Sequence, residues 1–126
     1  MNTGTLAPEL EPPYYAVVFT SVRNGADESG YSVMAARMKV LAEVQPGFLG
    51  MESVRREDGL GITVSYWESE DAVRSWKRNA EHLVAQEKGR EEWYAAYRLR
   101  VCRVEREYGF GKDTQRQPAG ADTPAR

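Results

Sequence analysis

Few residues in this chain are suited to acid–base chemistry. His82 is the only histidine and the only side chain with an ordinary pKa near neutrality, which makes it the candidate base. Trp76 lies six residues earlier and can donate a hydrogen bond from its indole N–H. Asn79 stands between them and can orient either a ligand or the imidazole. These three residues form the candidate polar site.

Other kinds of site find little support. With one cysteine, Cys102, and one histidine, the chain has no intrachain disulfide, and we expect no metal site built on such ligands. Gly59-Leu60-Gly61 stands in a predicted hairpin rather than between a strand and a helix, so it is not a phosphate-binding loop. No G-x-S-x-G nucleophile elbow occurs.

Composition narrows the function classes further. Seventeen basic and 19 acidic residues give a net charge of −2, which does not favour a nucleic-acid partner. No signal peptide or membrane-spanning run stands out, and a lone thiol suits a reducing compartment. We therefore expect a cytoplasmic protein with no membrane association.

The hydrophobic pattern predicts the elements that must position the site. Alternating or β-branched runs predict strands at 14–22, 48–55 and 62–67, and a last strand whose alternation runs through Tyr97, Leu99 and Val101. A helix is expected from the cap at Asp27 to near Gln45, before Pro46-Gly47. Ser69 is expected to cap a second helix that Asn79 interrupts, with a short further helix at about 80–89. The alternation slips between Val101 and Val104, which indicates a bulge or the strand end.

The element order predicts the fold class. Strand, helix, strand, strand, helix and strand make an α+β, ferredoxin-like βαββαβ domain with a four-stranded antiparallel sheet. The domain is expected at 14–110, with disordered tails at 1–13 and 111–126. Both faces of the first strand are apolar, and two helices cover only one face of the sheet. A symmetric homodimer that packs two sheets together would cover the other.

Several segments carry a resemblance to a known family. The segments QPGFLGMESVR, ITVSYWES, DAVRSWKRNAEH and WYAAYRLRVCRVEREYGF are similar to those of the antibiotic biosynthesis monooxygenase (ABM) family, across about residues 14–110. The resemblance implies a dimeric α/β barrel with a cavity between the sheet and helices of each subunit. That family includes quinone-forming oxygenases that use no cofactor, haem-degrading enzymes and proteins without assigned activity.

The resemblance can be tested residue by residue. Quinone-forming members carry a helical Trp, with a Tyr six residues later and an Asn four residues earlier. Trp76 fits the Trp position, whereas His82 stands in place of the Tyr and Ala72 in place of the Asn. Haem-degrading members use a first-strand Asn and a His ten residues after the Trp, where this chain has Gln86. The match implies an oxygenase without a cofactor, with His82 as base and Trp76 as cavity donor.

Each candidate residue also has a purely structural interpretation. His82 can bridge a helix break, Asn79 can cap a helix end, and Trp76 can belong to the core. Met34 and Met38 lie on a core stripe, although flexible methionines also suit a pocket for apolar ligands. Tyr66 and Trp67 point to opposite sheet faces, so at most one of them lines the cavity.

Three functions remain open. The first is a cofactor-independent monooxygenase that acts on a small aromatic or phenolic substrate, with Asn79, Trp67, Tyr66, Met34 and Met38 as substrate-binding candidates. The second is a non-catalytic dimer that binds a small aromatic or apolar ligand for sensing or transport. The third is a structural partner domain with a filled cavity.

Overall fold

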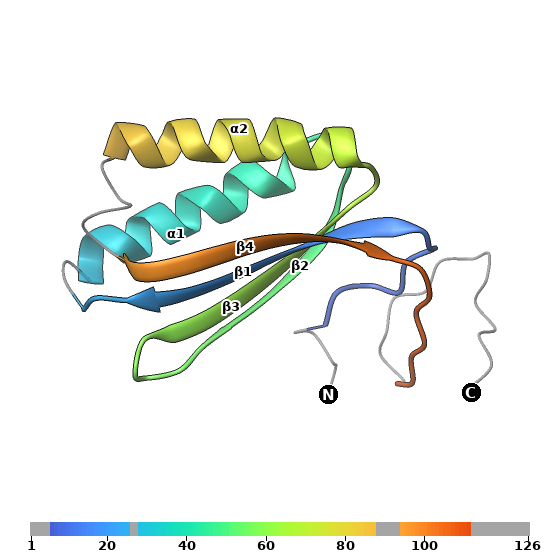
Figure 1. Cartoon of the computed structure of the whole chain (residues 1–126), viewed down its shortest axis with the longest axis horizontal. Helices are drawn as coiled ribbons and strands as arrows, with labels where there is room; N and C mark the ends of the chain where they lie inside the picture. The colour runs from blue at the N-terminus through green and yellow to red at the C-terminus, as the bar shows by residue number, and fades with distance from the viewer. Residues whose placement is uncertain (1–5, 26–27, 88–93, 112–126) are drawn as a thin grey trace.

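The computed structural model describes residues 6–25, 28–87 and 94–111. Its elements are β1 (Tyr14–Arg23), α1 (Glu28–Glu43), β2 (Phe48–Arg55), β3 (Leu60–Trp67), α2 (Glu70–Glu87) and β4 (Tyr94–Val104). The strands form one antiparallel sheet in the order β2-β3-β1-β4, and both helices lie on the same side of it (Figure 1). The ferredoxin-like α+β fold predicted from the element order is confirmed.

Alternation along β1 decides which side chains meet the helices. Val17 is almost completely buried with Trp67, Trp76 and other residues of the core, and Tyr15 packs against the same cluster. The neighbouring positions on β1 face the opposite side of the sheet. On that opposite side Tyr14 and Ala16 are buried near the start of β1, whereas Val22 near its end is exposed.

The start of α2 is held by local contacts and by a close approach. Ser69 Oγ accepts a hydrogen bond from the Ala72 N–H at 3.1 Å, which is the predicted cap. Gly47 has a φ of 87°, and a Cβ added there would lie 2.7 Å from the Ala72 Cβ. Only glycine suits that position, because any side chain would push α2 away from the end of α1.

Two sequence expectations need correction or refinement. The predicted break at Asn79 is wrong, because α2 runs unbroken from Glu70 to Glu87. A single asparagine weakens a helix only slightly, and the buried Trp76 and Ala80 beside it hold α2 on the sheet. The slip in alternation after Val101 precedes the end of β4 at Val104. The irregularity in the pairing of β1 with β4 lies elsewhere, between Val22 and Arg23 at the C-terminal end of β1. Asp27, the expected cap of the first helix, lies outside the described residues.

Residues 6–13 lie on the side of the sheet opposite the helices, close to the segment that follows β4 (Figure 1). Residues 6–13 fall in the tail expected to be disordered, but Leu10 is buried and backbone N–H groups of this segment bond to side chains of the sheet and of the C-terminal segment. Local composition could not reveal these distant partners. Residues 1–5 and 112–126 lie outside the described residues, and the 14–110 domain boundary stays a prediction.

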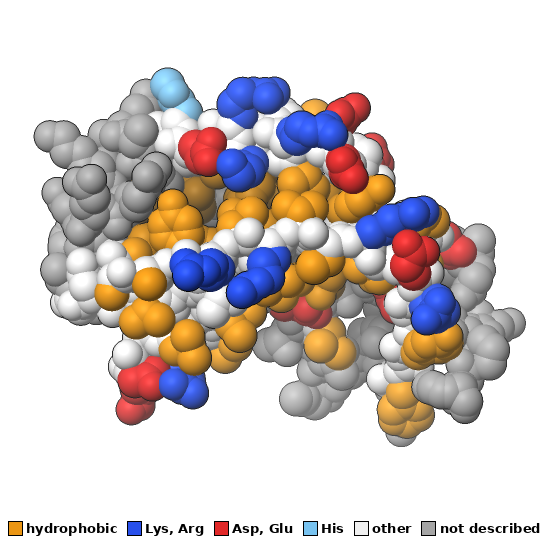
Figure 2. Space-filling view, in the orientation of Figure 1, with side chains coloured by type: hydrophobic (Ala, Val, Ile, Leu, Met, Phe, Trp, Pro, Cys, Tyr) orange, Lys and Arg blue, Asp and Glu red, His pale blue; other side chains and the backbone are white. Residues whose placement is uncertain are grey.

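The rest of that sheet face is open: it is apolar over β2, β3 and the end of β1, and carries Arg98 and Arg100 on β4. Its exposed side chains include Val54, Ile62 and Val22, of which Val54 and Ile62 are paired across β2 and β3. Hydrophobic side chains are visible along the lower edge of the molecule in Figure 2. Neither helix in the described part of the chain has the apolar length that crossing a bilayer requires.

Candidate functional site

Two tryptophans meet in the layer between the sheet and the helices. Trp67 at the end of β3 is fully buried, and Trp76 on α2 is 9% exposed. Their ring centroids lie 5.5 Å apart with an interplanar angle of 35°, and Phe48 meets Trp67 edge-on at 5.4 Å. Strand alternation and the helical stripe bring these three rings together, as the sequence indicated for Trp76 and the helix-facing strand residues.

The two indole N–H groups differ in their partners. Trp67 Nε1 donates to Ser65 Oγ at 2.8 Å, and both groups are buried. Trp76 Nε1 is buried and has no hydrogen-bond partner within the described part of the chain. A buried donor without an acceptor costs free energy, so native proteins rarely leave one. This N–H is suited to a ligand oxygen.

The structure does not bring His82 to this position. Six residues along an α-helix amount to 600° of rotation, so its side chain leaves α2 about 120° away from that of Trp76. His82 is accordingly exposed, while Trp76 is buried. Asn79 is exposed too, and its Nδ2 donates to Gln45 Oε1 at 3.2 Å. That bond ties α2 to the end of α1 and leaves neither side chain beside the indole rings.

The two candidate methionines lie on the buried side of α1. Met34 is 4% exposed, and Met38 is partly buried and packs against the core cluster that contains both tryptophans. The helical stripe expected in the sequence is therefore present. Met34 is thus a buried side chain, and Met38 is the one that packs against the cluster containing the indole rings.

Tyr66 lies on the opposite face of the sheet, as the alternation with Trp67 requires. Its hydroxyl donates to Glu52 Oε1 at 2.7 Å, and Glu52 Oε2 accepts the Ala7 N–H at 2.8 Å. A second carboxylate repeats this arrangement: Glu107 accepts both the Tyr14 hydroxyl and the Leu10 N–H. Two tyrosine–glutamate pairs thus hold the N-terminal segment on this face.

A pocket of about 250 Å³ opens beside these pairs. Its lining comes from the N-terminal segment, the sheet and the C-terminal segment, and includes Tyr14, Glu52, Tyr66 and Glu107. Burial, followed by the hydrogen bond and the charge of the adjacent carboxylate, raises the pKa of both tyrosines above the ordinary value. Both phenols therefore stay protonated donors at neutral pH. Sequence reasoning missed this pocket because its walls come from both chain ends.

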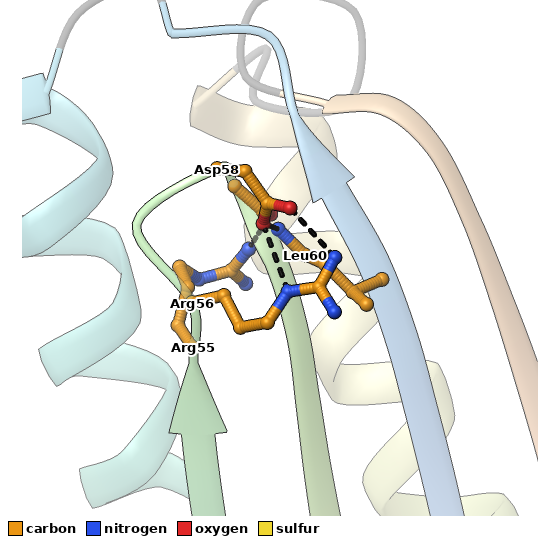
Figure 3. Close-up of polar contacts among 5 residues, drawn as sticks. Arg55, Arg56, Asp58 and Leu60 are labelled. Carbon is orange, nitrogen blue, oxygen red and sulfur yellow. Dashed lines mark hydrogen bonds and ion pairs between the residues drawn. The ribbon is translucent and has the colours of Figure 1, made fainter.

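A second cluster that the sequence did not reveal lies at the end of β1. The Arg23 guanidinium stacks over the Tyr31 ring at 3.7 Å, and the Arg55 guanidinium donates to the Tyr31 hydroxyl at 2.9 Å. The next residue, Arg56, belongs to the hairpin instead, where it forms two hydrogen bonds with the Asp58 carboxylate (Figure 3). The sequence places Arg55 at the end of a predicted strand and Arg56 in the following turn, but it does not reveal their hydrogen-bond partners.

Further polar side chains lie at the surface of β4 and beyond it. Cys102 is exposed, and Arg98 and Arg100 are exposed on the same strand. Arg103 pairs with Glu105 at 3.4 Å, and both side chains are more than half exposed. An exposed pair of this kind contributes little to stability.

Comparison with solved structures agrees with this architecture. SnoaB, described as a cofactor-independent oxygenase from Streptomyces nogalater, aligns with a TM-score of 0.62 and 15% identity, over 76% of this chain and 97% of that one. PA3566 from Pseudomonas aeruginosa aligns with a TM-score of 0.59 and 12% identity, over 79% and 99%. At such identities the similarity shows a shared fold.

Sequence comparison is more specific. The uncharacterized protein YqjZ of Bacillus subtilis (strain 168) is 55% identical over 109 residues, which cover 86% of this chain and 95% of the relative. The family model described as antibiotic biosynthesis monooxygenase matches residues 13–88, a span that includes β1 to α2 and both indole rings. The chain therefore belongs to the antibiotic biosynthesis monooxygenase family.

Proposed function

We propose that the protein is a monooxygenase that needs no cofactor and acts on a small phenolic or polycyclic aromatic substrate. The substrate would bind in the layer between the sheet and the helices, next to Trp76. Family membership supports an oxygenase, and the fold shared with SnoaB supports the cofactor-independent kind.

The observation that carries the proposal is the buried indole N–H of Trp76. It has no acceptor among the described residues, and it lies at the position where the family's quinone-forming members carry a tryptophan. A buried donor that is already in place can stabilise negative charge as it develops on a substrate oxygen, without the cost of reorienting water.

The chemistry requires an electron-rich substrate. Loss of a proton from a phenol or anthrone gives an anion that can pass an electron to dioxygen. The reacting CH₂ of an anthrone becomes a carbonyl, one oxygen atom enters the product and the other leaves as water. The substrate supplies all four electrons, so no external reductant is needed. The protein's part is to exclude water, orient the ring and stabilise the oxyanion.

The exposed position of His82 does not support a role as an internal base. A general base must come within hydrogen-bond reach of the proton that it removes, directly or through one water. The proposal therefore rests on Trp76, and His82 is kept only as a residue to be tested. Among the substrate-binding candidates, the proposal retains Met38 and Trp67, which contact the same core cluster as Trp76. Asn79, Met34 and Tyr66 are not retained.

We also propose a homodimer formed through the open apolar face of the sheet. Val54, Ile62 and Val22 are 69%, 40% and 37% exposed there. Packing this face against a second copy would remove these apolar side chains from water, which is the usual driving force for such assembly.

The second candidate is a ligand-binding protein without turnover. The same exposed position of His82 favours it, because the tryptophan layer then has a hydrogen-bond donor but no neighbouring imidazole. This function predicts that ligands stabilise the fold and emerge unchanged.

Oxygen uptake distinguishes the two candidates. Purified, metal-free protein is mixed with a panel of anthrones and hydroquinones, and oxygen consumption is followed together with quinone absorbance. We expect oxidation above the buffer rate, reduced at least tenfold in Trp76→Phe and unchanged in Lys77→Ala, whose exposed pair with Glu81 lies on the outer side of the same helix. Ligand-induced stabilisation without oxygen uptake across the panel would refute the monooxygenase and favour the binding protein.

A further inference from the structure

A cationic and aromatic cluster lies at the other end of the helix-facing layer. Ser21 and Gly61 pair there, six residues along β1 from Tyr15, which pairs with Trp67. At about 3.3 Å per strand residue, the two ends are separated by roughly 20 Å. This cluster is therefore separate from the tryptophan pair, and what it binds does not depend on the proposed oxygenase activity.

The two guanidinium groups of the cluster meet around one ring. Arg23 is only 8% exposed and stacks over the face of Tyr31 at 3.7 Å. Arg55 lies at the hydroxyl edge of the same ring, with its guanidinium carbon 5.3 Å from the ring centre. Because both distances start from one centre, the two cations lie within about 9 Å of each other, where they repel at the low effective dielectric of a partly buried site.

Arg55 donates only to neutral oxygens. Its partners are the Ser21 and Tyr31 hydroxyls, each at 2.9 Å, and the Gly59 carbonyl. No carboxylate pairs with it within the described part of the chain, although Arg56 next to it has one in Asp58. A partly buried guanidinium without a counter-charge is an unfavourable arrangement, which an anion would relieve.

The backbone leaves room for this guanidinium. A Cβ added at Gly61 would lie 2.5 to 2.8 Å from the Arg55 guanidinium atoms. The absence of a side chain at that position lets the group lie flat against β3. The group is thus held in place from two sides, by the strand below it and by Tyr31 of α1 above it.

Aromatic side chains surround the cations. Tyr94 contacts Tyr31, Phe19 and Tyr97 with ring centroids 5.7 to 5.8 Å apart. Burial raises the pKa of the Tyr94 phenol, and its hydrogen bond with Tyr31 acts in the same direction. Tyr94 is therefore neutral at physiological pH and does not balance the charge of Arg55.

We propose that Arg55, with Arg23 and Tyr31, forms a binding site for an aromatic carboxylate. The charge of the Arg55 guanidinium would attract the carboxylate, the N–H groups that Ser21, Tyr31 and Gly59 do not use would donate to it, and the neighbouring rings would contact the aromatic part of the ligand. The site lies at the end of β1 and β2, under the first turns of α1.

The test uses salicylate as the probe and its neutral amide, salicylamide, as the matched ligand. Binding to the full chain is measured by calorimetry and by the shift of the melting temperature. We expect salicylate to bind at least tenfold more tightly than salicylamide, because only the former offers a charged acceptor. Equal affinity for the two ligands, or no binding of salicylate at millimolar concentration, would overturn the proposal.

Variants locate the site. Arg55→Met is expected to weaken salicylate binding about tenfold or more, whereas Arg56→Met, which removes the neighbouring exposed arginine, should change it less than twofold. Gly61→Ala keeps every charge but displaces the guanidinium, so it should also weaken binding.

Near-UV circular dichroism verifies that each variant is folded. If Arg55→Met unfolds, Gly61→Ala and Arg55→Lys decide the question: both keep the positive charge, and both should weaken binding because neither keeps a planar guanidinium in its place. Equal effects of the Arg55 and Arg56 substitutions would contradict the assignment.

Discussion

The indole rings of Trp67 and Trp76 lie 5.5 Å apart, yet their N–H groups are in opposite situations. Trp67 donates to the buried Ser65 hydroxyl, whereas Trp76 has no acceptor among the described residues. The two rings share one core cluster, so they offer a matched pair for measuring what each N–H contributes.

Replacing each ring with phenylalanine separates a structural N–H from one available to a ligand. Trp67→Phe leaves the Ser65 hydroxyl without its donor, and Trp76→Phe removes a donor that had no acceptor. We expect Trp67→Phe to lower the free energy of unfolding by about 1–3 kcal/mol more than Trp76→Phe does. Urea denaturation followed by circular dichroism measures both. Equal losses would mean that the Trp76 N–H has an acceptor too.

His82 offers a test of the candidate base. Because its side chain is exposed on α2, we expect His82→Ala to change the rate of substrate oxidation less than threefold. Steady-state oxygen uptake by the two proteins is the measurement. A hundredfold loss in a folded variant would restore the imidazole as the base and require α2 to turn or a partner subunit to cover it.

The apolar sheet face predicts the oligomeric state. Val54→Asp places a charge in the middle of the proposed interface and is expected to convert a dimer to a monomer in light scattering after size exclusion. Val44 is equally exposed at 69% but lies beyond the end of α1, so Val44→Asp should leave the dimer intact. A wild-type protein that is monomeric at 100 micromolar concentration would refute this interface.

The tyrosine–glutamate pairs predict how stability responds to alkali. The pKa of Tyr14 and Tyr66 is raised in the folded state, so the folded protein resists ionisation that the unfolded chain undergoes near pH 10. Their contribution to stability is complete below that pH and is lost as the pH rises through the folded-state pKa.

Denaturation at pH 8, 10 and 11 measures this effect. Tyr66→Phe should lose less stability between pH 8 and 11 than the wild type does, because it has one raised phenol fewer. Ser53→Ala, which removes an exposed hydroxyl but no phenol, serves as the control and should follow the wild type. An identical alkaline loss in Tyr66→Phe and in the wild type would contradict the assigned cause.

Much of the architecture was predictable from the chain. Alternation at 14–22 and 62–67 and the stripe through Val73 and Trp76 are local patterns, since each depends on the period of one element. They were enough for the element order, for the ferredoxin-like topology and for the opposite directions of Tyr66 and Trp67.

Relations between distant segments were decided only by the tertiary structure. The spacing of Trp76 and His82 suggested one site, but the turn of the helix separates them. Glu52 and Glu107 hold an N-terminal segment that looks disordered by composition, and Arg55 and Arg56 differ in role although they are neighbours. Periodicity determines which face of an element a side chain takes, whereas its hydrogen-bond partner depends on which other segment packs there.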